Sequence, residues 1–190
     1  MKIIEFIKKR KLILILVLVL TAWIANSILS RIPERPQGPG EPGVSYRNLV
    51  PGVSSRSDVI EKMGNPVDQA AKGEEILLSF KSTSPTRTHE AIVDSGNTLS
   101  FIKEIVSVND DKHIADITSQ HGEAPHTLYG PHSINGFDLF VYPDKGLAYI
   151  GNPYGTQGTI LEIWYFPPTT IENFKSTWAP GYSNTYQPSQ

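Results

Sequence analysis

A short pattern that occurs twice constrains the fold of this chain more than any other feature. The stretch SDVIEKMGNP, residues 57–66, has the spacing of a short amphipathic helix that ends at a glycine and cannot continue past the proline. A weaker copy, ADITSQHGEAP, carries Asp116 where the first carries Asp58, an offset of 58 residues. The pattern Ile-x-Glu-Ile at 102–105 recurs at 160–163 with the same offset. Two segments that agree on one offset predict an internal duplication.

Each copy is predicted to contain one helix followed by three strands, because capping and turn residues precede runs of alternating apolar residues. We therefore expect an α+β fold: two tandem helix-plus-three-stranded antiparallel sheet repeats, 46–108 and 109–178, after an N-terminal transmembrane helix. The residues expected to cap the helices or form the turns that end them are Ser55, Asp58, Gly64 and Pro66 in the first copy and Asp116, Gly122 and Pro125 in the second.

The N-terminal segment differs from the rest of the chain. Residues 1–11 carry five Lys and Arg against one Glu, and 12–30 form an uncharged apolar run long enough to cross a membrane as a helix. This pattern predicts a signal-anchor with a cytoplasmic N-terminus and an extracytoplasmic C-terminal part. The alternative is a signal peptide cleaved after Ser27, which would give a secreted or periplasmic protein. A Pro/Gly-rich linker is expected at 31–45 and a flexible tail at 179–190.

The composition excludes several kinds of chemistry. The chain has no cysteine, so disulfides, thiolate metal sites and cysteine nucleophiles are absent. Beyond residue 11 there are 12 Lys and Arg against 18 Asp and Glu, a formal charge of −6. A surface with that balance is not expected to bind nucleic acid. No motif indicates a cofactor, so none is expected.

The stretch LVPGVSSRSDVIEKMGNPVDQ, Leu49–Gln69, resembles the opening of SmpA/OmlA (BamE-like) domains. The resemblance covers most of 49–166 and implies an envelope protein or a binder of other proteins without catalytic residues. Two consecutive copies also look like the architecture of the β-lactamase inhibitor protein. BamE itself is a lipoprotein, whereas this chain has no cysteine to lipidate. The matching residues are Gly52, Ser54, Asp58, Val59, Gly64 and Pro66, with Asp116, Ile117, Gly122 and Pro125 in the second copy.

Histidines near the second helix raise the alternative of a zinc site. His121, Glu123 and His126 place two imidazoles and a carboxylate within six residues. The glycine and proline between them remove any regular facing geometry, and a histidine in the last helical turn is also favourable beside free carbonyl groups. We therefore expect no metal and keep these residues as weak candidates only.

Aromatic residues are concentrated in the second copy, and two interpretations of them remain open. They either form the core of the sheet or supply an exposed patch that contacts a partner protein, since aromatic residues are enriched at such contacts. The candidates for partner binding are Tyr142, Tyr149, Tyr154 and Tyr165.

These observations favour a non-catalytic, membrane-anchored protein-interaction or scaffolding module of the bacterial cell envelope, with another envelope protein as partner. The first alternative is a secreted or anchored protein that inhibits an enzyme by binding it. The second, disfavoured alternative is a metal-dependent enzyme such as a zinc hydrolase, because no sequence motif of a hydrolase accompanies the histidines.

Overall fold

The computed structural model describes residues 43–155 and 157–186. All of them belong to the second of the two units into which the chain divides, Met1–Gly38 and Pro39–Gln190. The elements in chain order are α2 (Arg56–Met63), β1 (Asp68–Lys72), β2 (Glu75–Lys81), β3 (Thr88–Val93), β4 (Leu99–Ile105), α3 (Ile114–His121), β5 (His126–Leu128), η1 (Ser133–Asn135), β6 (Asp138–Tyr142), η2 (Pro143–Lys145), β7 (Leu147–Asn152), β8 (Thr159–Tyr165) and α4 (Ile171–Thr177).

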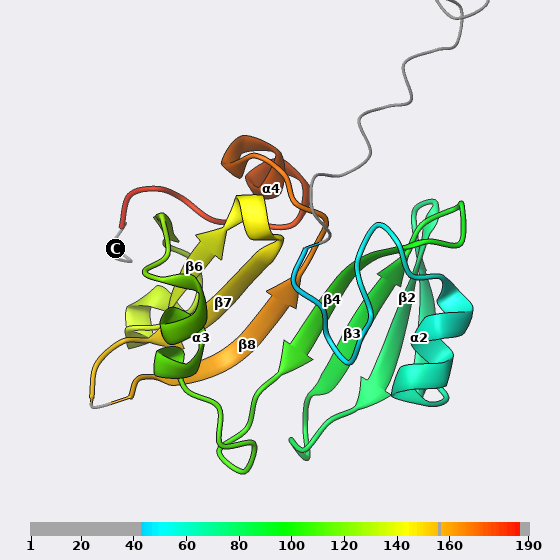
Figure 1. Cartoon of the computed structure of the whole chain (residues 1–190), viewed down its shortest axis with the longest axis horizontal. Helices are drawn as coiled ribbons and strands as arrows, with labels where there is room; N and C mark the ends of the chain where they lie inside the picture. Colours follow the sequence, from blue (N-terminus) through cyan, green and yellow to red (C-terminus); the bar gives the residue numbers. More distant parts are fainter. Residues whose placement is uncertain (1–42, 156, 187–190) are drawn as a thin grey trace, which may run out of the picture. The chain divides into compact units, whose positions relative to one another are not determined.

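All eight strands belong to one antiparallel sheet, in the order β1-β2-β3-β4-β8-β7-β6-β5 (Figure 1). The predicted pair of tandem helix-plus-three-stranded repeats is therefore wrong. Each half supplies four strands to one sheet, in which β4 pairs directly with β8, and an unpredicted third short helix, α4, follows β8. Strands β1 and β5 were not predicted. All five residues of β1 are exposed and so show no apolar alternation, and β5 has only three residues.

The two helices that follow the repeated pattern begin and end alike. The backbone N–H of Ser55 donates to Asp58 Oδ2 at 2.7 Å, and that of His113 donates to Asp116 Oδ2 at 2.8 Å. Gly64 and Gly122 end the helices with φ of 86° and 78°. Pro66 and Pro125 follow in the connections to β1 and β5. The offset of 58 residues therefore holds across both helices, where backbone hydrogen bonds and capping chemistry are local.

The same offset does not hold in the last strand of each half. Glu104 pairs with Ile163, so these two side chains share a face of the sheet, and Glu162, next to Ile163, lies on the other face. The register shifts leave Ser100 of β4 and Leu161 of β8 bulged, 61 residues apart instead of 58. Because a bulge reverses which side chains face the core, the two aligned glutamates have different surroundings.

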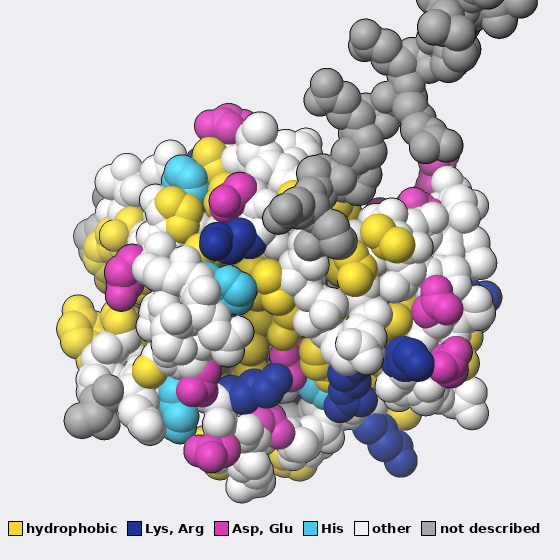
Figure 2. Space-filling model, in the orientation of Figure 1, with side chains coloured by type: hydrophobic (Ala, Val, Ile, Leu, Met, Phe, Trp, Pro, Cys, Tyr) yellow, Lys and Arg dark blue, Asp and Glu magenta, His cyan; other side chains and the backbone are white. Residues whose placement is uncertain are grey.

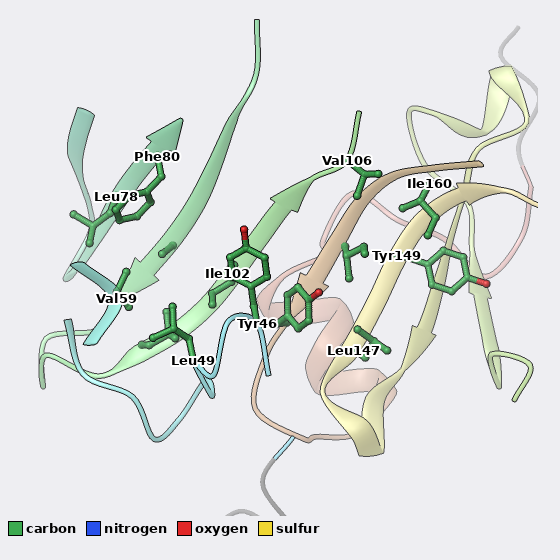
Figure 3. Packing of buried hydrophobic residues seen from close by; sticks show 14 of the residues in the cluster. Tyr46, Leu49, Val59, Leu78, Phe80, Ile102, Val106, Leu147, Tyr149 and Ile160 are labelled. Carbon is green, nitrogen blue, oxygen red and sulfur yellow. The ribbon is translucent and has the colours of Figure 1, made fainter. Parts of the chain in front are cut away.

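The sheet has an apolar core on each face. One core lies under α2 and α3 and includes Val59 and Ile114 from these helices, and Figure 3 shows how its members from both halves pack together. The other core contains Phe174 of α4, whose ring centroid is 4.6 Å from that of Phe166 and 6.3 Å from that of Trp164. Both cores are continuous across β4 and β8, so neither half encloses a core of its own.

The C-terminal segment expected to be a tail lies against the sheet as far as it is described. Ala179 is buried, and the Tyr182 ring centroid is 6.0 Å from that of Trp164. Ser183 pairs with Tyr129 through two backbone hydrogen bonds of 2.8 and 2.9 Å. This pairing continues the edge of the sheet just beyond β5 and covers part of it.

The prediction of a single-pass, signal-anchored membrane protein is not borne out by the described structure. Within residues 43–155 and 157–186, no helix is both long enough and apolar enough to cross a membrane. The segments predicted as a basic flank, 1–11, and as an anchor, 12–30, lie outside the described residues, as does most of the linker at 31–45.

Gly146, at the start of β7, provides a test of how tightly the ends of β7 and β8 are packed. Gly146 and Gly73 have φ of 66° and 64°, so replacing either by alanine costs about 1–2 kcal/mol of backbone strain. A Cβ at Gly146 would lie 2.0 Å from the carbonyl oxygen of Phe166, whereas a Cβ at Gly73 would meet nothing within 4 Å. Urea denaturation should show Gly146→Ala to be destabilised by at least about 2 kcal/mol more than Gly73→Ala. Equal losses would contradict the close packing.

Candidate functional site

A groove opens on the face of the sheet that carries α2 and α3. It consists of two adjoining cavities of about 250 and 360 Å³, whose walls share Ser45, Lys112 and Tyr165. We call the two together the central groove, the smaller one the apolar cavity and the larger one the polar cavity. Figure 2 shows hydrophobic side chains at the floor of a hollow on this face, with charged side chains beside it. The apolar cavity is lined by Val44, Ile117, His121, Leu147, Ile160 and Ile163, among others.

The polar cavity is built around a buried carboxylate. Glu104 is only 6 % exposed, although it lies in an otherwise largely apolar strand. Tyr165 Oη donates to Glu104 Oε2 at 2.9 Å, and Lys112 Nζ donates to Glu104 Oε1 at 2.5 Å. A buried carboxylate is tolerated only with such partners, because removing an unpaired charge from water costs several kcal/mol. The pair Glu104–Lys112 therefore links β4 to the connection that precedes α3.

His89 of β3 forms another wall and has a defined tautomer. Its Nδ1 accepts a hydrogen bond from the backbone N–H of Ile105 at 3.0 Å, so the proton of the neutral ring is on Nε2. Burial lowers the pKa of His89, although the nearby Glu104 carboxylate acts in the opposite direction. The imidazole is therefore neutral at pH 7 and presents its Nε2–H group as a donor to the polar cavity that it lines.

Tyr46 and Arg47 close the polar cavity on the side of the first described segment. The ring centroid of Tyr46 lies 5.5 Å from that of Tyr165 and 6.0 Å from that of His89. Its Oη is buried without a hydrogen-bond partner among the described residues, and burial, followed by the Glu104 charge, raises the pKa of Tyr46 to about 12. The Arg47 guanidinium lies over the Tyr46 ring, 5.1 Å from its centroid.

Three of the four tyrosines predicted as partner contacts lie inside the protein. Tyr142, Tyr149 and Tyr165 are between 1 % and 7 % exposed, whereas Tyr154 is 80 % exposed. Tyr142 Oη donates to the carbonyl oxygen of Gly122 at 2.7 Å, and the Tyr142 and Tyr149 ring centroids are 6.4 Å apart. The structure therefore does not bring the four together on the surface. Of the two open interpretations, packing in the core fits the three buried tyrosines. Among the four, Tyr165 alone borders the central groove.

The weak metal candidates are separated. His121 lies at the end of α3, with its ring 6.0 Å from that of Tyr142, and Glu123 is exposed in the connection to β5. His126 begins β5 and borders a different cavity, beside α4. In the part of the chain that the structure describes, no three His, Asp or Glu side chains are placed to hold a metal ion.

Only Tyr165 among the residues that line the polar cavity was a candidate predicted from the sequence. Glu104 and His89 left a signal, because each is a polar residue among the apolar positions of a strand. Tyr46 and Arg47 left none, since they precede the first recognisable element. Lys112 was indistinguishable from any other exposed lysine until the fold placed it beside Glu104.

Comparison of the chain with family models, curated proteins and solved structures yields no match. The resemblance to SmpA/OmlA domains therefore stays a prediction that rests on the quoted residues alone.

Two tyrosines of the polar cavity allow a matched stability test. Tyr165→Phe removes the donor to Glu104, and leaving a buried carboxylate without one of its partners should cost about 1–3 kcal/mol. Tyr46→Phe removes a buried hydroxyl that has no partner among the described residues, so the free energy of unfolding should stay unchanged or rise. Urea denaturation of both variants measures the difference. A loss of more than about 1 kcal/mol in Tyr46→Phe would show that its hydroxyl is satisfied in solution.

His89 should make stability depend on pH. Its folded-state pKa lies below the unfolded value of about 6.5, so the unfolded chain binds more protons in this range. The contribution of His89 is therefore complete above about pH 6.5 and is lost as the pH falls through the lower folded-state pKa. His89→Asn keeps an acceptor near the position of Nδ1 and cannot titrate. Denaturation between about pH 7.5 and 5 should show a shallower decline for the variant than for the wild type; identical declines would exclude His89 as the source.

Proposed function

We propose that this chain is a non-catalytic protein-binding module that holds an extended segment of a partner protein in the central groove. The observation that carries the proposal is the continuity of the two cavities, which share three wall residues. Each is larger than one side chain, and together they offer an apolar and a polar site at adjacent positions. An extended segment with one apolar and one polar side chain matches that arrangement.

The chemistry of the walls supports a segment that lies across the sheet. Leu147, Ile160 and Ile163 supply apolar surface in one cavity, and burying an apolar side chain there contributes about 25 cal/mol per Å². His89 and Glu104 supply polar groups in the other cavity, where they fix orientation more than they add affinity. An apolar anchor beside a polar contact is the usual composition of a small protein-binding site.

The groove is held in shape by backbone hydrogen bonds. Val44 N donates to the carbonyl oxygen of Lys145 at 3.0 Å, which ties the first described segment to the turn before β7. Tyr46 and Leu49 exchange two backbone hydrogen bonds of 3.0 and 2.8 Å. Strands β4 and β8 form the floor of the groove, and these hydrogen bonds fix the first described segment beside it. The groove is therefore formed before a partner binds. A preformed site loses less conformational entropy on binding than a mobile one.

Ser45 allows the groove to be blocked without changing the core. It is exposed and borders both cavities, so the indole of Ser45→Trp should fill the groove. Random dodecapeptides displayed on phage and selected on the full chain provide the probe. Peptides that bind the wild type should lose at least about tenfold in affinity for Ser45→Trp, measured by fluorescence polarisation.

Ser95→Trp is the matched control, since Ser95 is exposed in the turn between β3 and β4, at the end of β4 distant from Glu104. This variant should bind the selected peptides as the wild type does, and circular dichroism should give the same spectrum for all three proteins. Failure to enrich any peptide, or equal binding to Ser45→Trp, would overturn the proposal.

A further inference from the structure

We propose that the polar cavity is a subsite for a carboxylate, supplied by an Asp or Glu side chain of the bound segment. This inference rests on the proposed function in taking a partner segment as the source of the carboxylate. It follows from the hydrogen bonds of the walls: both carboxylates already accept from groups of the chain, whereas His89 Nε2–H and the Arg47 guanidinium have no acceptor among the described residues.

The two carboxylates of the cavity are engaged by groups of the chain itself. Each oxygen of Glu104 already accepts a hydrogen bond, one from Lys112 and one from Tyr165. Asp110 Oδ2 accepts from the backbone N–H of Ser107 and from Thr83 Oγ1, both at 2.7 Å. An ammonium or guanidinium ligand could use only the lone pairs that these donors leave, and it would enter the cavity beside the positive charges of Lys112 and Arg47.

The donors that remain point to an anion. His89 uses Nδ1 to accept from Ile105, and its Nε2–H has no acceptor among the described residues. Arg47 is exposed at the mouth of the cavity and forms no ion pair with a described carboxylate. Its guanidinium is held over the Tyr46 ring, where it can donate two parallel hydrogen bonds to one carboxylate.

The charges around the site agree with this assignment. Lys112 is paired with Glu104, so these two charges cancel at the floor. Asp110 also lines the cavity, and hydrogen bonds from Ser107 and Thr83 hold it in place without cancelling its charge. Arg47 is the cation of the cavity without an ion-pair partner among the described residues. A carboxylate therefore gains an ion pair with Arg47 and a hydrogen bond from neutral His89.

Three small probes test the subsite independently of any peptide. They are the N-acetyl amides of glutamate, glutamine and lysine, titrated into ¹⁵N-labelled full chain and followed by NMR. The glutamate probe should give saturable shifts at the amides of Arg47, His89 and Ile105, with a Kd of about 1–10 mM. The isosteric, neutral glutamine probe should bind at least about fivefold more weakly, and the lysine probe should cause no saturable shifts there.

Two variants identify the donors. Arg47→Gln and His89→Asn should each weaken the glutamate probe at least about fivefold, and His89→Asn keeps an acceptor for the Ile105 N–H. Arg56→Gln is the control, since Arg56 lies on α2 and donates to Gln69. Preferential binding of the lysine probe, equal binding of glutamate and glutamine, or shifts that survive Arg47→Gln would each overturn the carboxylate subsite.

The selected peptides separate this inference from the function on which it rests. If they bind in the groove, replacing their acidic residue by its amide should lower affinity for the wild type and have no effect in Arg47→Gln. Suppose instead that the peptides lose affinity for Ser45→Trp and yet bind the wild type equally well with the acid or its amide. That result would support the groove as a peptide site and reject the carboxylate subsite. If the glutamate probe binds saturably but the selection yields no peptide, the polar cavity is a carboxylate site whose ligand is not a partner segment.

Discussion

The pairing of β4 with β8 is the interaction on which the rest of the structure depends. Residues from Ile102 to Ile105 pair with residues from Tyr165 to Glu162, and this contact alone converts two four-stranded meanders into one sheet. Both apolar cores run across it, so each half needs the other to bury its side chains. A four-stranded half of this size would bury too little apolar surface to be secure alone.

The same pairing creates the polar cavity. Glu104 comes from β4 and Tyr165 from β8, and their hydrogen bond spans the seam between the two halves. At the end of β4, where the ladder stops, the backbone N–H of Ile105 donates to His89 Nδ1 of β3. Lys112 reaches the cavity from the connection to α3. The complete groove is therefore a consequence of joining the halves, because each copy supplies only part of its walls.

The bulges explain how related halves acquired different roles. At offset 58 the sequence aligns Glu104 with Glu162, yet Glu162 lies on the opposite face, where Trp164 Nε1 donates to it at 2.7 Å and Arg87 pairs with it. One glutamate borders the groove and the other is enclosed near the core under α4. A shift in the position of one bulged residue is enough to separate a groove-lining residue from a structural one, because strand side chains alternate between faces.

Local chemistry was readable in the sequence, and long-range placement was not. The caps at Ser55 and Asp58, the stops at Gly64 and Gly122, and most strands follow from contacts within about six residues, so their pattern predicts them. The β4–β8 pairing joins residues 57 to 63 positions apart, and the polar cavity depends on that pairing. The exposed strand β1 and the bulges leave no side-chain pattern. The sequence by itself determined the two repeated helices, their ends and the alternation of most strands, whereas α4 was not predicted. Only the tertiary structure decided which strands pair and which glutamate meets the groove, because register is set by packing between segments distant in the chain.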